Sequence, residues 1–157
     1  MKLKILAATA LFLMSSPSPA ETIVIKAAAM VDVENGALVA NPVITVTDGT
    51  IRSIASGTPS LPEGSRLIDL GDKVVMPGLI DMHVHFMGKA TDQGYRRLAI
   101  SHERAAITGV MNARTTLIAG FTTVRNVGAP SFSDVALRDA IAAGDVPGPR
   151  MFVSGPA

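Results

Sequence analysis

Apolar and polar residues alternate along much of the chain between Thr22 and Val75, and this pattern predicts β-strands. Strands are expected at residues 22–25, 28–33, 43–47 and 50–55, with one or two more within 66–75. Asp48-Gly49 separates two of the alternating runs. It predicts a hairpin with a type I′ turn, because both central residues of that turn need positive φ. This part of the chain is therefore expected to be all β.

After Pro77 the pattern changes to apolar runs that alternate with helical periodicity. The runs predict strands at 78–86, 121–127 and 150–154, and the helical spacing predicts helices at 95–119 and 134–143. Ser133 is expected to cap the second helix. The mostly apolar run 78–86 is typical of a strand buried on both faces. Strand, helix, strand, helix, strand is the order of parallel βαβ units, so this part is predicted to be α/β.

The first twenty residues have the pattern of a secretory signal peptide. Lys2 and Lys4 precede an apolar run of residues 5–14, and small residues lead to Ala20. An apolar run of this length falls short of the roughly 20 residues that span a bilayer. We therefore expect cleavage near Ala20, a secreted or periplasmic location and no stable membrane span.

Composition narrows the possible partners. The chain has 14 basic and 13 acidic residues, and removal of Lys2 and Lys4 leaves a slight acidic excess, which does not favour nucleic acid. One tyrosine and no tryptophan make a base-stacking platform improbable. The absence of cysteine excludes the disulfide-stapled class of small secreted domains. Composition therefore gives no indication of a nucleic-acid partner.

Two of the three histidines, His83 and His85, lie two residues apart near the end of the run 78–86. Alternate residues of a strand point to the same face, so both imidazoles can reach one spot. Imidazole is a common zinc ligand, and in β/α folds the carboxyl ends of the strands line the active site. The pair is therefore a candidate metal site. The alternative is a pair of hydrogen-bonded core histidines.

The segment from Val75 to His85 resembles the first metal-binding motif of the amidohydrolase superfamily. In that superfamily the HxH sequence closes the first strand of a (β/α)8 barrel. Segments 119–126, 136–144 and 147–150 are similar to the imidazolonepropionase-like branch, which includes metal-dependent Xaa-Pro dipeptidases. The resemblance implies a β-sandwich segment at 21–75, followed at 76–157 by two βα units and the third strand of a TIM-type barrel that is incomplete in this chain.

The resemblance also implies a hydrolase that uses one or two divalent ions, usually zinc. The implied reaction is cleavage of an amide or peptide bond in a small molecule, with a dipeptide as the expected substrate. The residues that match family ligands are His83 and His85. A bridging lysine, further histidines and an aspartate base are expected beyond Ala157. No catalytic residue is therefore assigned within the chain, and substrate-binding residues stay unassigned. As an N-terminal fragment, it is expected to be inactive alone.

Two other functions stay open. One is a cyclic-amide hydrolase or deaminase of the imidazolonepropionase-like kind. The other is an inert product, which is either a truncated reading frame or a binding module. The number of ions and the oligomeric state are also left open by the sequence.

Four other residues have simpler expected roles. Asp81 shares the histidines' strand face and is expected to bond backbone groups rather than a metal. Arg125 and Asn126 end the second strand, where alternation lets one of them face inward. His102 lies on a charged helical stretch and is expected to be solvated.

Overall fold

The computed structural model describes residues 21–92 and 94–156, so the predicted signal peptide lies outside the described residues. The chain forms two compact units, of which one ends at Met76 and the other begins at Pro77. Within the described residues, every helix is too short or too polar to cross a bilayer.

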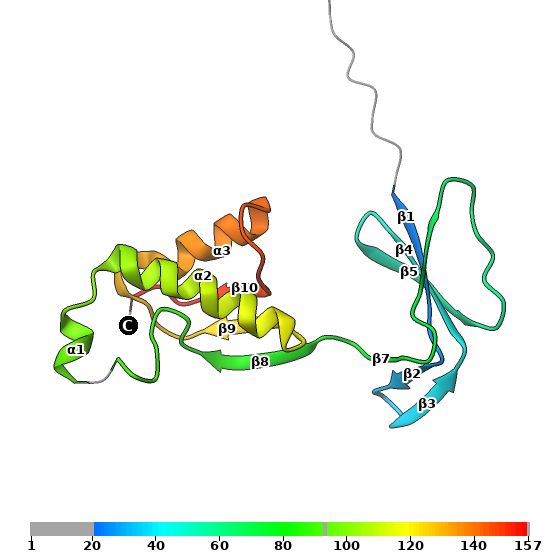
Figure 1. Cartoon of the computed structure of the whole chain (residues 1–157), viewed down its shortest axis with the longest axis horizontal. Helices are drawn as coiled ribbons and strands as arrows, with labels where there is room; N and C mark the ends of the chain where they lie inside the picture. Colours follow the sequence, from blue (N-terminus) through cyan, green and yellow to red (C-terminus); the bar gives the residue numbers. More distant parts are fainter. Residues whose placement is uncertain (1–20, 93, 157) are drawn as a thin grey trace, which may run out of the picture. The chain divides into compact units, whose positions relative to one another are not determined.

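The first unit consists of two small sheets (Figure 1). The larger sheet has the order β5-β4-β1-β6. Its strands are β1 (Thr22–Lys26), β4 (Pro42–Thr47), β5 (Thr50–Ser56) and β6 (Arg66–Asp69). The smaller sheet has the order β3-β2-β7, formed by β2 (Ala29–Asp32), β3 (Ala37–Ala40) and β7 (Val74–Val75). In the described part of this unit, Val24, Ala27, Pro42 and Val43 are buried.

The hairpin predicted from Asp48-Gly49 is confirmed. β4 and β5 pair antiparallel, with Thr47 opposite Thr50. Asp48 has φ 48° and Gly49 has φ 71°, as a type I′ turn requires.

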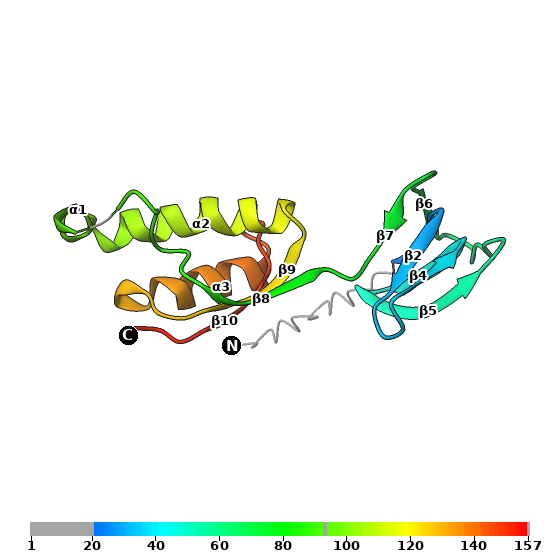
Figure 2. The same cartoon turned by 90° about the horizontal axis from the view of Figure 1, so that it is seen from below.

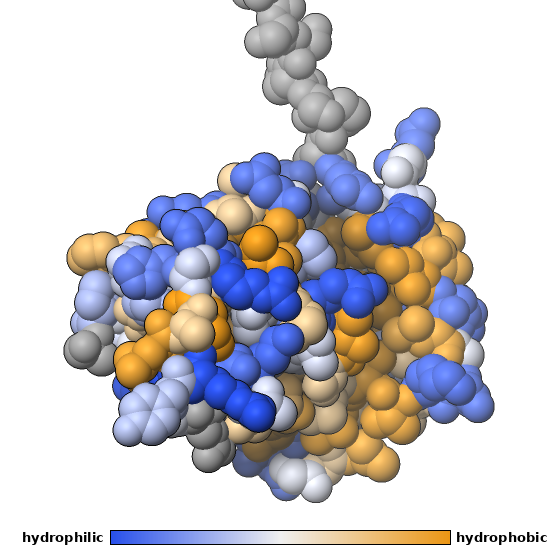
Figure 3. All heavy atoms as spheres, turned by 60° about the vertical axis from the view of Figure 1, so that its left-hand side comes forward, coloured by the Kyte–Doolittle hydropathy of each residue, from blue (hydrophilic) through white to orange (hydrophobic). Residues whose placement is uncertain are grey.

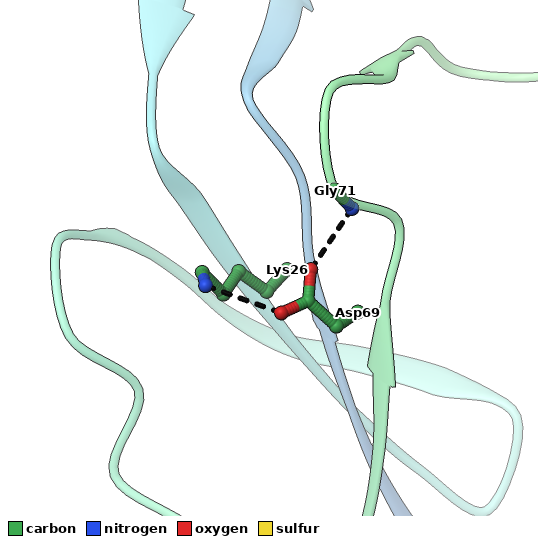
Figure 4. A network of polar contacts seen from close by, with 3 residues as sticks. All are labelled: Lys26, Asp69 and Gly71. Carbon is green, nitrogen blue, oxygen red and sulfur yellow. Dashed lines mark hydrogen bonds and ion pairs between the residues drawn. The ribbon is translucent and has the colours of Figure 1, made fainter.

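Asp69 fixes the turn that follows β6 (Figure 4). β6 pairs parallel with β1, and this register places Asp69 opposite Lys26. The carboxylate accepts hydrogen bonds from the Gly71 backbone N–H at 2.9 Å and from Lys26 Nζ at 3.2 Å. The hydrogen bond from Gly71 lowers the pKa of Asp69 most, and the hydrogen bond from Lys26 lowers it further, so this pKa lies below its usual value.

The second unit is a three-stranded parallel sheet with helices on one side (Figures 1 and 2). The strand order is β10-β9-β8, formed by β8 (Leu79–Val84), β9 (Phe121–Asn126) and β10 (Arg150–Val153). The helices α2 (His102–Ile118) and α3 (Ser133–Ala143) pack on each other and on the sheet. The core includes Phe86, Ala113, Val124, Leu137 and Met151. The predicted α/β class is confirmed.

The single long helix predicted over 95–119 is wrong. The segment contains a short helix α1 (Tyr95–Leu98) and, after a break, α2. Ser101 begins α2 as its N-cap, because its Oγ accepts a hydrogen bond from the Arg104 N–H at 3.2 Å. Leu98, an apolar residue of α1, is 83% exposed.

The cap predicted at Ser133 is also wrong. Ser133 is the first residue of α3, and its hydroxyl donates to the Pro130 carbonyl at 2.7 Å instead of accepting from the helix. The short 3-10 turn η1 (Pro130–Phe132) precedes α3, and its Pro130 carbonyl is the acceptor for this hydroxyl. The predicted end of the helix at residue 143 is confirmed, and Gly144 after it has a left-handed φ of 83°.

β8 differs most from expectation, because it is not buried on both faces. Ile80 is 63% exposed and Met82 49%. The strand pairs with β9, and at its other edge the structure describes no neighbouring strand. The register also places Ile80 beside Thr123 and Arg150, on the face opposite buried Val124. The helices α2 and α3 cover the face that carries Val124, and the face that carries Ile80 is left open.

Candidate metal centre

His83 and His85 lie together at the carboxyl end of β8. His83 is the last residue but one of the strand, and His85 follows it. Both are exposed, and their ring centroids lie 5.3 Å apart in an edge-to-face arrangement of 73°. The alternative of a buried, hydrogen-bonded core pair therefore does not hold.

Asp81 is engaged with the backbone, in agreement with its predicted role. Its Oδ1 accepts a hydrogen bond from the His83 N–H at 2.9 Å. The pairing of β8 with β9 shifts register between Asp81 and Val84, so the strand is irregular at His83. Strict alternation does not extend through this segment, yet the two imidazoles remain adjacent.

The separation of the two ring centroids is compatible with one shared ion. With a zinc–nitrogen bond of about 2.1 Å and near-tetrahedral angles, the centroids of two ligating imidazoles lie about 5 Å apart. The centroid separation in the chain is 5.3 Å. Catalytic zinc usually has three protein ligands. In residues 21–92 and 94–156 no group of three or more His, Asp or Glu side chains could hold a metal, so these residues do not form a site with three protein ligands.

The backbone on both sides of His85 is held by the end of β9. The Val84 carbonyl accepts a hydrogen bond from the Val127 N–H at 3.1 Å. The Phe86 N–H donates to Asn126 Oδ1 at 2.8 Å. The Phe86 carbonyl in turn accepts from Asn112 Nδ2 of α2 at 2.7 Å. The position of His85 is therefore set by β9 and α2 as well as by its own strand.

Arg125 and Asn126 turn out to have structural contacts. Arg125 is exposed, and its Nε donates to the Met82 carbonyl at 2.7 Å, which ties β9 to β8. Asn126 is completely buried. Of the two residues, Asn126 is thus the one directed into the protein, and its partner is the backbone beside His85.

A cavity of about 780 Å³ opens beside His85. Residues of the loop after β8, of α1 and α2, and of the loop after β9 line it. Lys89 and Arg97 bring positive charge, Asp92 brings negative charge, and His102 also lines the wall. Figure 3 brings the α1 side of Figure 1 forward and shows hydrophilic side chains beside apolar ones there.

Sequence reasoning left the residues of this cavity unassigned. His102 is exposed, as predicted, but the pattern did not indicate that it shares a cavity with His85. The signal available was a polar segment, residues 88–94, directly after the strand with the two histidines. Loops after strands carry the pocket residues of β/α folds.

Sequence comparison identifies the relatives. The model of the amidohydrolase family matches residues 74–157. An L-hydantoinase of Paenarthrobacter aurescens is 40% identical over 67 residues, which are 43% of this chain and 14% of the relative. A dihydroorotase of Geobacter sp. (strain M21) is 32% identical over 120 residues, which are 76% of this chain and 24% of the relative. The chain thus spans less than a quarter of the length of these two relatives.

Solved structures are similar to this chain over a larger share of its length. A Xaa-Pro dipeptidase with methionine bound in its active site has a TM-score of 0.77 and 34% identity, and the match covers 87% of this chain and 34% of that one. A prolidase in complex with N-methylphosphonate-L-proline has a TM-score of 0.75 and 30% identity, with 85% and 32% of the two chains covered. From the family match over 74–157 and these structures, the chain belongs to the amidohydrolase family.

Proposed function

We propose that the protein to which these residues belong is an exported, zinc-dependent hydrolase of carbon–nitrogen bonds, and that His83 and His85 are two of its metal ligands. The observation that carries the proposal is the pair of adjacent, exposed imidazoles at the carboxyl end of β8. A bound zinc ion would supply a water of lowered pKa and polarise the scissile carbonyl. The chain itself contributes the two imidazoles and one wall of the cavity beside them.

A dipeptide is the substrate that we favour. The structures with the high TM-scores quoted above are a Xaa-Pro dipeptidase and a prolidase, and each match covers more than four fifths of this chain. Lys89 and Arg97 in the cavity lining suit the carboxylate that a dipeptide carries. Hydrolysis of a cyclic amide is the second candidate, supported by the similarity to the hydantoinase and the dihydroorotase.

The metal role is tested with single alanine variants of His83 and His85. Zinc affinity is measured by isothermal titration calorimetry, with His102→Ala as the matched control, because His102 is an exposed histidine that lines the same cavity. Loss of either ligand should weaken zinc binding more than about tenfold, or about 1.4 kcal/mol, whereas the control keeps the wild-type affinity. Equal losses in all three variants, or none, would contradict the assignment.

The substrate is tested on the full-length protein. Its hydrolysis of an Xaa-Pro dipeptide is compared with its hydrolysis of dihydroorotate and of a hydantoin, each with and without added zinc. We expect turnover of the dipeptide and loss of turnover after metal removal. Turnover of a cyclic amide alone would favour the second candidate.

Export is proposed from residues 1–20 and rests on the sequence pattern alone. Cell fractionation and N-terminal sequencing of the mature protein test it. The expected result is a periplasmic or secreted protein that begins at Glu21. A cytoplasmic protein that retains Met1 or Lys2 would refute it.

A further inference from the structure

A polar network is buried beneath the candidate metal centre. Asn126 at the end of β9 and Asp134 on α3 both have 0% exposure. Asp134 Oδ2 accepts hydrogen bonds from Asn126 Nδ2 at 3.2 Å and from the Gly155 N–H at 3.1 Å. Its Oδ1 accepts from the Val135 N–H at 2.9 Å. Among the described ion pairs, none includes Asp134, so amide groups surround the carboxylate.

The network reaches the loops that follow all three strands of the second unit. Through Asn126 Oδ1 it holds the Phe86 N–H after β8. Asn126 itself ends β9, and its Nδ2 also approaches the Gly128 carbonyl at 3.2 Å. Through Asp134 it holds Gly155, which follows β10. The carboxyl ends of these strands therefore share one set of hydrogen bonds.

We propose that Asn126 and Asp134 form a positioning pair that sets the backbone at His85 and thereby orients this imidazole for a metal. The inference rests on the proposed metal role of His85. Neither member touches the imidazole, and both act through the Phe86 N–H, which is the first donor after His85.

The chemistry of the pair explains why an acid is buried there. An amide has a donor side and an acceptor side, whereas both oxygens of Asp134 accept hydrogen bonds. The carboxylate therefore turns the NH2 group of Asn126 toward itself and leaves Oδ1 to face the Phe86 N–H. A reversed amide would place donor against donor at Phe86 and acceptor against acceptor at Asp134. Both mismatches are costly in a buried site.

A single substitution at each of the two positions tests the proposal. Asn126→Asp places two carboxylates together, and Asp134→Asn removes the group that orients the amide. Asp139→Asn is the matched control, because Asp139 is an exposed acid on the same helix.

Two properties are measured on each variant at a temperature where circular dichroism shows it folded. The first is the NMR chemical shift of the His85 ring in metal-free protein, and the second is the zinc affinity. Each single variant should shift the His85 signal and weaken zinc binding by about 10–100-fold, as loss of an outer-shell partner does. The Asp139→Asn control should leave both properties unchanged.

Folded single variants with an unchanged His85 signal and unchanged zinc affinity would overturn the proposal and leave the pair a purely structural role. Changes of the same size in the Asp139→Asn control would overturn it too. If wild-type protein fails to bind zinc, the proposed metal function fails, while the metal-free His85 signal still decides whether the pair positions this ring.

Discussion

At the scale of single residues, Gly78 shows how closely β8 approaches β9. A Cβ atom added to Gly78 would overlap Oγ1 and Cγ2 of Thr122 and lie 2.6 Å from its Cβ. Because the conflict includes an atom next to the backbone, it is not relieved by turning the threonine side chain. Gly78→Ala should therefore lower the free energy of unfolding by about 1–3 kcal/mol, measured by urea denaturation.

Gly88→Ala is the matched control for this substitution. A Cβ atom at Gly88 meets nothing within 4 Å, and the residue is not in the left-handed region. The control should have nearly wild-type stability. An equal loss in both variants would mean that general glycine replacement, and not the contact with Thr122, is responsible.

The residue scale also shows which parts of the site could be predicted. The spacing of His83 and His85 is a local property, so the sequence indicated that the two rings are adjacent, although the strand is irregular there and strict alternation does not hold. Asn126 was recognised as a strand-end residue but not as the partner of the Phe86 N–H, which is 40 positions away in the sequence. Asp134 was read simply as a helix residue, since nothing local indicates that it is completely buried.

At the scale of elements, the end of β6 depends on the charge of Asp69. The Gly71 N–H and then the Lys26 ammonium lower the pKa of this carboxyl in the folded protein. Its contribution to stability is therefore complete above the unfolded pKa of about 3.9 and disappears as the pH falls through the lower folded value. Asp69→Asn should destabilise the protein at neutral pH, and the difference from wild type should shrink in acid.

Urea denaturation of both proteins between neutral and acidic pH measures this difference. Asp72→Asn is the control, because the Asp72 carboxylate is paired with the adjacent Lys73 at 2.8 Å and so closes no contact between strands. If Asp69→Asn remained as destabilising in strong acid as at neutral pH, the charge of Asp69 would not be the cause.

Sequence patterns predicted an element correctly where a few neighbouring residues determine it. They failed where contacts with residues distant in the sequence determine the bounds or the burial of an element. The β4–β5 hairpin follows from Asp48-Gly49, two residues that supply the required positive φ. The break before α2 depends on the Ser101 side chain capping the helix, which the periodicity of 95–119 concealed. The exposure of β8 depends on which strands and helices surround it, and the apolar sequence of the strand does not indicate those neighbours.

At the scale of the whole molecule, the face of the β8–β9–β10 sheet opposite α2 and α3 is open and partly apolar. Ile80 is 63% exposed and Phe152 56%, and β8 forms the edge of the sheet. Exposed apolar patches beside an unpaired strand edge promote association. The 157-residue chain should therefore show an apparent mass that rises with concentration in light scattering coupled to size-exclusion chromatography.

Ile80→Lys should lower this concentration dependence, since a charge at a sheet edge opposes pairing with another chain. Leu61→Lys is the matched control: Leu61 is also an exposed apolar residue, at 51%, but it lies in a loop of the other unit. A chain that stays monomeric at every concentration, or equal effects of the two lysines, would contradict the assignment of association to this face. A reduction confined to Ile80→Lys would show that the open sheet, and not general surface hydrophobicity, drives it.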